Sequence, residues 1–353
     1  MNKYLLPLLL TAGVAPLASA QQDFSLVQSA PTMDRWMYPF NFSSGSETSA
    51  ATFGAISEPG FDDRDAQFLI GFDTPDGFPS GLDPNTYEIT SLRVRAAVST
   101  DLRFQYDPSA DSVRNLYATS DPEYIADSDP GTPMEIYAAG YRNGQTVWTF
   151  NEGSPFSPFP AIPPQEGVRS VFPAVFDTMG IAIDVSRQVR QRFESTPMAF
   201  GITAAVAPGD WVPAGTTFDF NADLSNPATL AYVRQGLSDG RLRFVITTLA
   251  PATGGPGGGS GYYPAYYTKE NATAIALGLT ASLEIQGRVL PACDPDVNCD
   301  GSVNGFDIEA MEQAVNGDFA NFCQNDADYN KDGAVNGFDV EAVEQGVNGA
   351  PCP

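Results

Sequence analysis

The chain contains no histidine, and residues 21–290 contain no cysteine. These absences exclude Ser-His-Asp triads, Cys-His nucleophiles and histidine-bound zinc or iron from that long region. The glycine-rich run 254–261 lacks a Gly-Lys-Ser/Thr and indicates a flexible loop, not a phosphate-binding one. Paired carboxylates remain, as in glycoside hydrolysis. Glu135, Glu152 and Asp177 are candidates, but acids at the surface of an acidic protein are the simpler interpretation.

Basic residues are also scarce. The chain has 18 Lys and Arg against 43 Asp and Glu, which gives a formal net charge of −25. Residues 293–353 contain thirteen acidic residues and a single lysine. Nucleic acid and anionic membrane surfaces are therefore not expected as partners.

Long hydrophobic runs are missing except at the start. Met1–Lys3 is basic, Tyr4–Leu17 is apolar, and Ala18-Ser-Ala20 has the small residues of a cleavage site. This pattern predicts a signal peptide over residues 1–20 and an extracellular or cell-surface location. No later segment is long enough for a transmembrane helix.

The last sixty residues contain the same twelve-residue loop twice, starting at Asp296 and Asp328, 32 residues apart. Each copy runs into a stretch with an apolar face, over 308–315 and 340–347. Positions 1, 3, 5, 9 and 12 supply side-chain oxygens, position 7 a backbone carbonyl, and glycine at position 6 allows the sharp turn, as in calcium loops. The predicted ligands of two calcium ions are Asp296, Asn298, Asp300, Ser302, Asn304 and Asp307, and Asp328, Asn330, Asp332, Ala334, Asn336 and Asp339.

Two departures from an EF-hand narrow the interpretation. The prolines of 290–295 disfavour a helix before the first loop, and position 12 is Asp instead of Glu. The tandem loop-then-helix unit resembles a type I dockerin, and more narrowly the cysteine-flanked dockerin-like tails of exported planctomycete-type bacterial proteins. The resemblance implies two calcium ions and docking to a cohesin-like or other surface-anchoring protein.

The resemblance to dockerins implies that loop positions 10 and 11 contact the partner. Here they are Gly305-Phe306 and Gly337-Phe338, so the same pair recurs in both copies. The alternative is that Phe306 and Phe338 pack in a small core beside Met311, Val315, Val343 and Val347.

All four cysteines lie in this tail, and four cysteines allow three pairings. Because the ends of a two-fold repeat tend to meet, we favour Cys293–Cys352 together with Cys299–Cys323. A small unit with few large apolar residues needs such cross-links. A zinc site is disfavoured because paired C-x-x-C motifs and histidines are lacking.

Residues 21–290 are predicted to form one all-β domain, since several segments alternate apolar and polar residues between proline and glycine clusters. A helix is predicted over 185–193, capped by Asp184. The fold class is mainly β: a jelly-roll-like β-sandwich followed by a small α-helical calcium module over 291–353. The predicted strands span 66–72, 88–98, 102–106, 145–150, 179–184, 199–205, 241–247 and 279–285.

The order of these segments resembles DNRLRE-type exported β-sandwich modules. The similar segments are 63–72, 89–94, 183–189 and 267–271. This resemblance implies a structural or adhesive role, in some members with glycan association.

Two further features have competing interpretations. Asp62-Asp-Arg-Asp65 is interpreted as a solvated turn before a strand, with a cation site as the alternative. Tyr262–Tyr267, with Trp148 or Trp211, is interpreted as packing over the rim of the sandwich, with stacking on sugar rings as the alternative.

The sequence as a whole predicts a non-catalytic, exported structural or adhesive protein, anchored or assembled through its calcium-dependent tail. The alternative is a secreted carbohydrate-binding module or polysaccharide-degrading enzyme.

Overall fold

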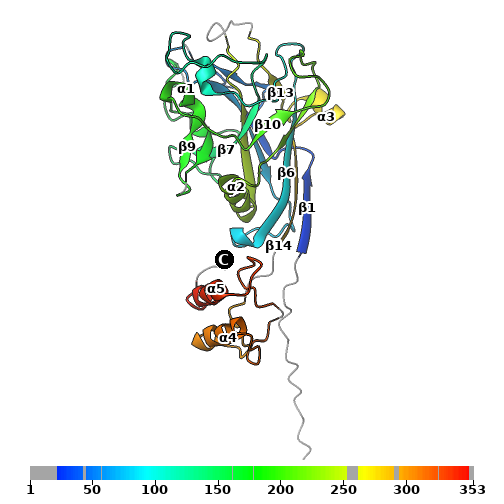
Figure 1. Ribbon diagram of the computed structural model, residues 1–353. Coiled ribbons are helices and arrows are strands. Elements are labelled where there is room, and N and C mark those ends of the chain that lie inside the picture. The colour runs from blue at the N-terminus through cyan, green and yellow to red at the C-terminus, as the bar shows by residue number, and fades with distance from the viewer. Residues whose placement is uncertain are drawn as a thin grey trace, which may run out of the picture. The chain divides into compact units, whose positions relative to one another are not determined.

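The computed structural model describes residues 22–42, 45–56, 58–160, 162–177, 179–252, 261–289, 294–324 and 326–349. Contacts divide the chain into a β domain, Asp23–Arg288, and a C-terminal unit that follows from Val289 (Figure 1). The predicted signal peptide, Cys293 and Cys352 lie outside the described residues.

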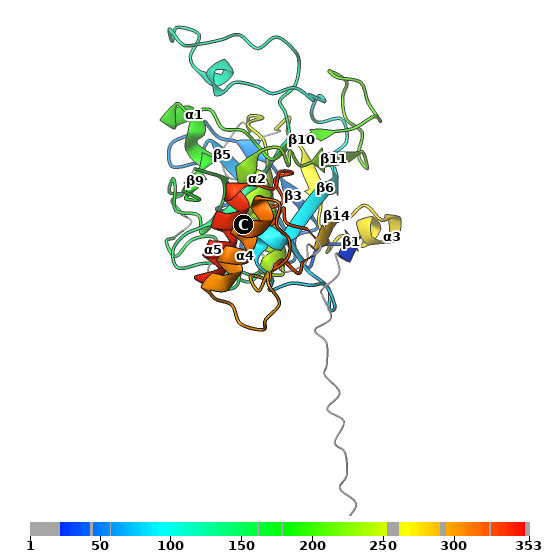
Figure 2. The same cartoon turned by 60° about the horizontal axis from the view of Figure 1, so that its bottom comes forward.

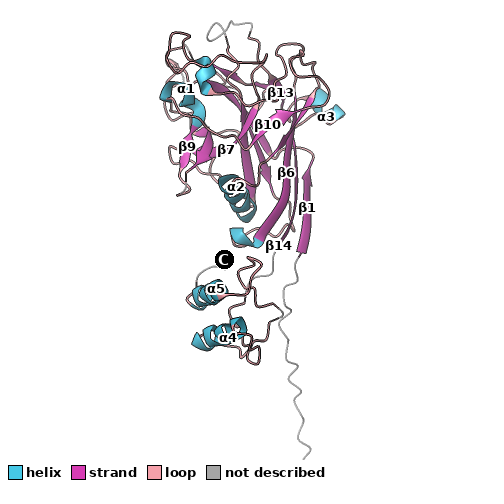
Figure 3. Ribbon diagram, viewed as in Figure 1, coloured by secondary structure: helices cyan, strands magenta, loops and turns pink. Residues whose placement is uncertain are grey.

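The β domain is built from fourteen strands in the described residues, and the predicted mainly-β class is confirmed (Figure 3). The strands are β1 (Gln22–Gln28), β2 (Met33–Met37), β3 (Ser49–Ala51), β4 (Phe53–Gly54), β5 (Arg64–Asp73), β6 (Tyr87–Ala97), β7 (Glu135–Tyr141), β8 (Val171–Phe176), β9 (Ala182–Asp184), β10 (Ala199–Ile202), β11 (Thr217–Asn221), β12 (Arg241–Thr247), β13 (Ala265–Tyr267) and β14 (Ser282–Val289).

Twelve of these strands form one curled antiparallel sheet in the order β1-β14-β6-β11-β10-β7-β12-β5-β2, with β4 on β5, β8 on β7 and β9 on β8. Strands β13 and β3 form a separate pair. Strand β10 turns the corner: Ala199 and Phe200 pair with β7, whereas Gly201 and Ile202 pair with β11. A strand that changes partners in this way joins the two layers of a folded-over sheet.

The centre of the domain is the pairing of β5 with β2 and β12. Nine of the ten β5 residues are buried, because apolar side chains occur on both faces of the strand. Leu69 of β5 and Val245 of β12 belong to a buried cluster with Met37, Phe150 and Val171. A strand buried on both faces loses the apolar-polar alternation of an exposed sheet.

Three short α-helices and three 3₁₀ turns complete the β domain: α1 (Gln188–Gln191), α2 (Pro227–Ser238), α3 (Ala272–Leu277), η1 (Pro84–Thr86), η2 (Val113–Leu116) and η3 (Val185–Arg187). Helix α2 was not predicted from the sequence, although it begins with a clear N-terminal signal. Asn226 Oδ1 accepts the amide of Ala228 at 3.0 Å, and Pro227 occupies the first turn.

Some local predictions were wrong. The predicted strand 145–150 is a turn, because Thr146 and Thr149 bond to each other's backbone amides. The predicted strand 102–106 contributes one isolated bridge, Gln105 to Trp211. The predicted helix 185–193 splits into η3 and α1, which stops at Arg192 in the left-handed conformation.

The C-terminal unit contains two eleven-residue helices, α4 (Gly305–Val315) and α5 (Gly337–Val347), which pack against each other. Their inward side chains, such as Met311 and Val343, form a small core with Val297 and Tyr329. Among the described residues, no helix has the length and apolar character needed to cross a membrane.

Candidate functional site

The first loop of the C-terminal unit is folded around its own side-chain oxygens. The amide of Asp300 donates to Asp296 Oδ1 at 3.1 Å and to Asn298 Oδ1 at 2.9 Å. The amide of Gly301 donates to Asp296 Oδ2 at 3.0 Å, and that of Ser302 to Asp300 Oδ1 at 2.8 Å. The side-chain oxygens at loop positions 1, 3 and 5 thus all bond to backbone amides of the same turn.

The second loop repeats these bonds within 0.1 Å. The amide of Asp332 donates to Asp328 Oδ1 at 3.1 Å and to Asn330 Oδ1 at 2.9 Å. The amides of Gly333 and Ala334 donate to Asp328 Oδ2 and Asp332 Oδ1, both at 2.9 Å. Two loops of different sequence therefore adopt one conformation.

The sharp turn requires left-handed backbone at two positions in each loop. Gly301 and Gly333, at position 6, have φ of 86° and 91°. Cys299 and Lys331, at position 4, have φ of 56° and 61°. The glycines were predicted from the motif, whereas the left-handed residue at position 4 was not, since neither Cys nor Lys signals it.

The aspartate at position 12 closes each loop onto the following helix. Asp307, which is 0% exposed, accepts the amide of Asn298 on Oδ1 at 3.3 Å and that of Asn304 on Oδ2 at 2.8 Å. Asp339 accepts the equivalent pair at 3.1 and 2.8 Å. Both helices therefore begin with a capping box, which ties a loop oxygen to the helix start.

The asparagine at position 9 caps the helix and also bonds to the backbone carbonyl at position 7. Asn304 Oδ1 accepts the amide of Phe306 at 2.9 Å, and Asn304 Nδ2 donates to the Ser302 carbonyl at 3.0 Å. Asn336 makes the same two bonds in the second loop. The position 9 side chain thus acts as the N-cap of the helix.

The donor set of the loops fits calcium. Each loop supplies three aspartates, asparagine amides and a backbone carbonyl, and a hard cation takes oxygen ligands of this kind. Zinc would favour nitrogen or sulfur. In the described part of the unit, the one ion pair joins Lys331 to Asp326 at the surface, so the buried Asp307 and Asp339 have no basic partner.

The side chain at loop position 11 points to the surface of the unit, away from its core. Phe306 and Phe338 are 66% and 65% exposed, so the alternative that they pack in the core was wrong. Val303 and Val335, at position 8, are also exposed. Each copy of the repeat therefore presents an apolar pair beside the start of its helix.

A disulfide joins Cys299 to Cys323, with 6.0 Å between the Cα atoms, as predicted. It links the first loop to the segment after α4, where the amide of Cys323 also donates to the Val297 carbonyl at 2.9 Å. The second predicted bridge, Cys293–Cys352, lies outside the described residues and stays a prediction.

The candidate carboxylates of the β domain have separate partners. Glu135 forms a buried ion pair with Arg64. Asp177 Oδ1 accepts the amides of Met179 and Ile181 at 2.9 and 2.8 Å, which stabilises a turn. Glu152 accepts the amide of Asp34 at 3.1 Å. These three acids each stabilise local structure at a different place in the domain.

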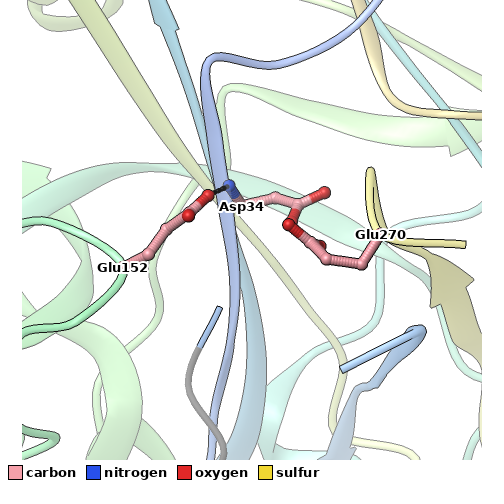
Figure 4. A group of neighbouring side chains, drawn as sticks. All are labelled: Asp34, Glu152 and Glu270. Atoms are coloured by element: carbon pink, nitrogen blue, oxygen red, sulfur yellow. Dashed lines mark hydrogen bonds between the residues drawn. The ribbon is translucent and has the colours of Figure 1, made fainter. Parts of the chain in front are cut away.

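Glu152 does belong to another acidic group, with Asp34 and Glu270 (Figure 4). Lys269 Nζ contacts the carboxylates of both Glu152, at 2.7 Å, and Glu270. Burial is the main cause that raises the pKa of Asp34 to about 8; the amide bond from Lys269 lowers this pKa, and the charge of Glu270 raises it. The ammonium and a proton on Asp34 therefore offset the charge of this cluster.

The Asp62–Asp65 cluster is buried, so its interpretation as a solvated turn was wrong. Arg169 Nε lies 2.8 Å from Asp62 Oδ2, and its Nη2 lies 3.4 Å from Asp65 Oδ1. Arg190 Nε lies 2.6 Å from Asp63 Oδ1. Arginines thus occupy the place of the cation considered from sequence, and they come from segments more than 100 residues away.

The tyrosine cluster divides between core and surface. Tyr266 is fully buried and stacks on Phe68, and Tyr263 packs against Phe53. Tyr262 is 65% exposed and lies 6.0 Å from the ring of Trp211, which is 45% exposed. Packing therefore accounts for Tyr263 and Tyr266, whereas Tyr262 remains exposed at the surface.

A third acidic group was missed from the sequence. Asp107, Asp111 and Asp129 each place one carboxylate oxygen within 4.8 Å of the others. The spacing Asp107-x-Ser109-x-Asp111 resembles loop positions 1, 3 and 5 of the tail and was the available signal.

Residues 294–348 match the family model of the dockerin type I domain. A search of curated proteins finds no match for this chain. The predicted resemblance of the β domain to exported sandwich modules stays a prediction. Dockerin type I domains bind calcium and assemble onto cohesin partners. The duplicated loops, their capping boxes and the family match together identify residues 294–348 of this chain as a C-terminal dockerin type I domain.

Proposed function

We propose that the chain is an exported, non-catalytic structural or adhesive protein that is assembled at the cell surface through its dockerin domain. The domain binds two calcium ions, one in each loop, and docks to a cohesin-like protein. The β domain is the displayed part.

The observation that carries this proposal is the equivalence of the two loops. The amides of Asp300 and Asp332 donate to equivalent side-chain oxygens at the same two distances, 3.1 and 2.9 Å. Two loops of one conformation with one donor set are expected to bind two ions of one kind. Calcium binding is then coupled to folding, because the ion holds together oxygens that would repel one another without it.

The docking surface follows from the same symmetry. Val303 with Phe306, and Val335 with Phe338, are exposed apolar pairs at equivalent positions. Exposed aromatic side chains of this kind serve as anchors in protein interfaces. Because the two copies present the same pair, either one supplies an anchor when the other is lost.

The non-catalytic role of the β domain is supported by the state of its candidate acids. Glu135 is neutralised by Arg64, and Glu152 by Lys269. A general acid or nucleophile requires a carboxylate directed at a substrate. A polysaccharide panel tests this role: turnover that disappears in Glu152→Gln would overturn it.

Docking is tested with an immobilised panel of cohesin domains and the chain from Gln21 to Pro353, in calcium and in chelator. We expect binding in calcium alone. Phe306→Ala with Phe338→Ala should weaken binding at least tenfold while leaving calcium binding intact, and each single change should have a small effect. Phe319→Ala is the matched control, because Phe319 is 54% exposed in the same unit but lies outside both repeats.

Two results would contradict the docking proposal. Binding that persists in chelator would remove the role of calcium. Equal binding by the Phe306/Phe338 double variant and the Phe319→Ala control would place the interface elsewhere.

A second candidate function for the β domain is glycan binding. The exposed pair Trp211 and Tyr262 supports it, because aromatic faces stack on sugar rings. Glycan-array binding that is lost in Trp211→Ala but kept in Trp148→Ala would favour this function, since Trp148 is an exposed tryptophan in contact with Arg241.

A further inference from the structure

The segment between β6 and β7 is a long irregular connection with one short helix, η2. Figure 2 shows the teal loop that carries this helix extending away from the strands of the β domain. One end of the loop is fastened near α1, where Ser112 and the amide of Val113 both donate to Glu194. Irregular connections of this length are uncommon in compact domains and are usually functional or disordered.

Three aspartates of this segment come together beside that contact. One carboxylate oxygen each of Asp107, Asp111 and Asp129 lies within 4.8 Å of the other two. Asp107 is only 3% exposed, and its Oδ1 accepts the amide and hydroxyl of Ser109 at 2.8 and 2.6 Å. Its Oδ2 is buried and has no hydrogen-bond partner. A buried carboxylate oxygen without a donor carries a large desolvation cost unless it binds a cation or a proton.

The backbone is shaped to bring these acids together. Gly131 has φ of 119°, and a Cβ at this position would lie 2.7 Å from Asp107 Cβ. Only glycine permits this approach, which places the segment after Asp129 directly against Asp107. The meeting of residues 107–111 with 129–131 is thus built into the fold.

No basic side chain balances the three acids. Among the described residues, Asp107, Asp111 and Asp129 form no ion pair with Lys or Arg. The Asp34 cluster differs, because Lys269 lies against it, and the Asp62–Asp65 cluster is neutralised by arginines. The group at Asp107 is therefore the one of the three acidic groups that has no basic side chain of its own.

We propose that Asp107, Asp111 and Asp129 bind a calcium ion that fastens the 107–131 loop to the β domain. Carboxylate oxygens are hard ligands, and the absence of nitrogen and sulfur donors disfavours zinc. The partly exposed loop leaves room for water ligands and for the irregular coordination that calcium accepts more readily than magnesium.

The test separates this site from the two dockerin loops. Calcium is titrated calorimetrically into the chelator-stripped chain Gln21–Pro353. We expect three ions for the unaltered chain, one for Asp300→Ala with Asp332→Ala, and two for Asp107→Asn with Asp111→Asn. Asp76→Asn, an exposed acid in another loop, should retain three. Loss of the dockerin sites alone would leave the single β-domain ion in place, so the two proposals fail independently.

Trypsin provides a second readout. Arg114 is the one Lys or Arg between residues 104 and 141. In the chain with substituted dockerin loops, calcium should slow cleavage after Arg114 at least tenfold, and the protection should disappear in Asp129→Asn. Because Asp129 is exposed, this change is not expected to impair folding.

Three outcomes would overturn the proposal. One is a dockerin-loop variant that binds no calcium. Another is protection of Arg114 that is equal in Asp129→Asn and in Asp76→Asn. The third is protection by magnesium at concentrations at which calcium has no effect, which would refute the calcium assignment.

Discussion

Asp62 in the β domain and Asp307 in the dockerin domain are both buried, with exposed fractions of 2% and 0%, but their charges are balanced differently. Asp62 has the guanidinium of Arg169 at 2.8 Å. Asp307 has only the backbone amides of Asn298 and Asn304. The buried Asp62–Asp65 cluster of the β domain thus has its own counter-cations, whereas we expect the dockerin loops to take theirs from solution. The stability of the two units should therefore respond to different changes.

The largest effect is expected in the β domain when one of its own cations is removed. Arg169→Met leaves Asp62 and Asp65 buried without their partner, which should lower the free energy of unfolding by about 3–5 kcal/mol. Urea unfolding in saturating calcium and in chelator measures this loss, which should be the same in both. Arg93→Met is the control, because its pair with Glu284 is about one-third exposed. If calcium restored the free energy of unfolding of Arg169→Met, the buried acids of the β domain would not depend on their own arginines as we claim.

The next effect concerns the covalent link of the dockerin domain. Cys299→Ser with Cys323→Ser removes a disulfide of sequence separation 24, for which the chain-entropy relation gives a stabilisation of about 3.5 kcal/mol. The change should raise the calcium concentration needed to order α4 and α5 and leave the β domain unaffected. Helical circular dichroism during calcium titration measures the shift. Unchanged calcium dependence would show that the bridge does not stabilise the first loop.

A smaller effect is expected from each closing aspartate. Asp307→Ala removes an acceptor for two amides and a calcium ligand, and the unpaired amides alone should cost about 1–3 kcal/mol. Asp339→Ala should behave alike because its bonds are equivalent. Each variant should lose one calcium ion by calorimetry, and Glu309→Gln, an exposed acid on α4, should lose none. Unequal losses would contradict the equivalence of the two loops.

The smallest effect is a pH dependence of the β domain that arises at Asp34. Its pKa is raised by burial from 3.8 to about 8, in a cluster with Glu152, Glu270 and Lys269. Between these values the folded state binds more protons than the unfolded state, so the free energy of unfolding should fall as pH rises from about 4 to about 8. Asp34→Asn should flatten this slope in urea titrations at pH 5 and 7.5. A parallel slope in the variant would mean that Asp34 is ionised in the folded chain.

The features that could be predicted from the sequence are those whose residues lie close together along the chain. The dockerin ligands lie within twelve residues of one another, so their spacing alone indicated the loops, the glycines at position 6 and the helices that follow. Strand β12, Arg241–Thr247, was likewise predicted within its observed bounds, because its apolar run is local.

The charge pairing of the β domain could not be predicted in this way. Asp62 meets Arg169 across 107 residues, and Asp34 accepts the backbone amide of Lys269 across 235, so no local pattern indicates that either acid is buried. Helix α2 is a different case: Asn226-Pro227 carried a start signal that was overlooked. The exposure of Phe306 and Phe338 depended on which face of each helix meets the other, and the structure decides that question.

The most direct test of this account is hydrogen exchange of the full chain from Gln21, measured by mass spectrometry in calcium and in chelator. We predict that the amides of α4 and α5 lose protection in chelator, while those of β5 and β12 keep theirs. Equal protection of α4 and α5 in both conditions would contradict the claim that calcium holds the dockerin domain in its folded form.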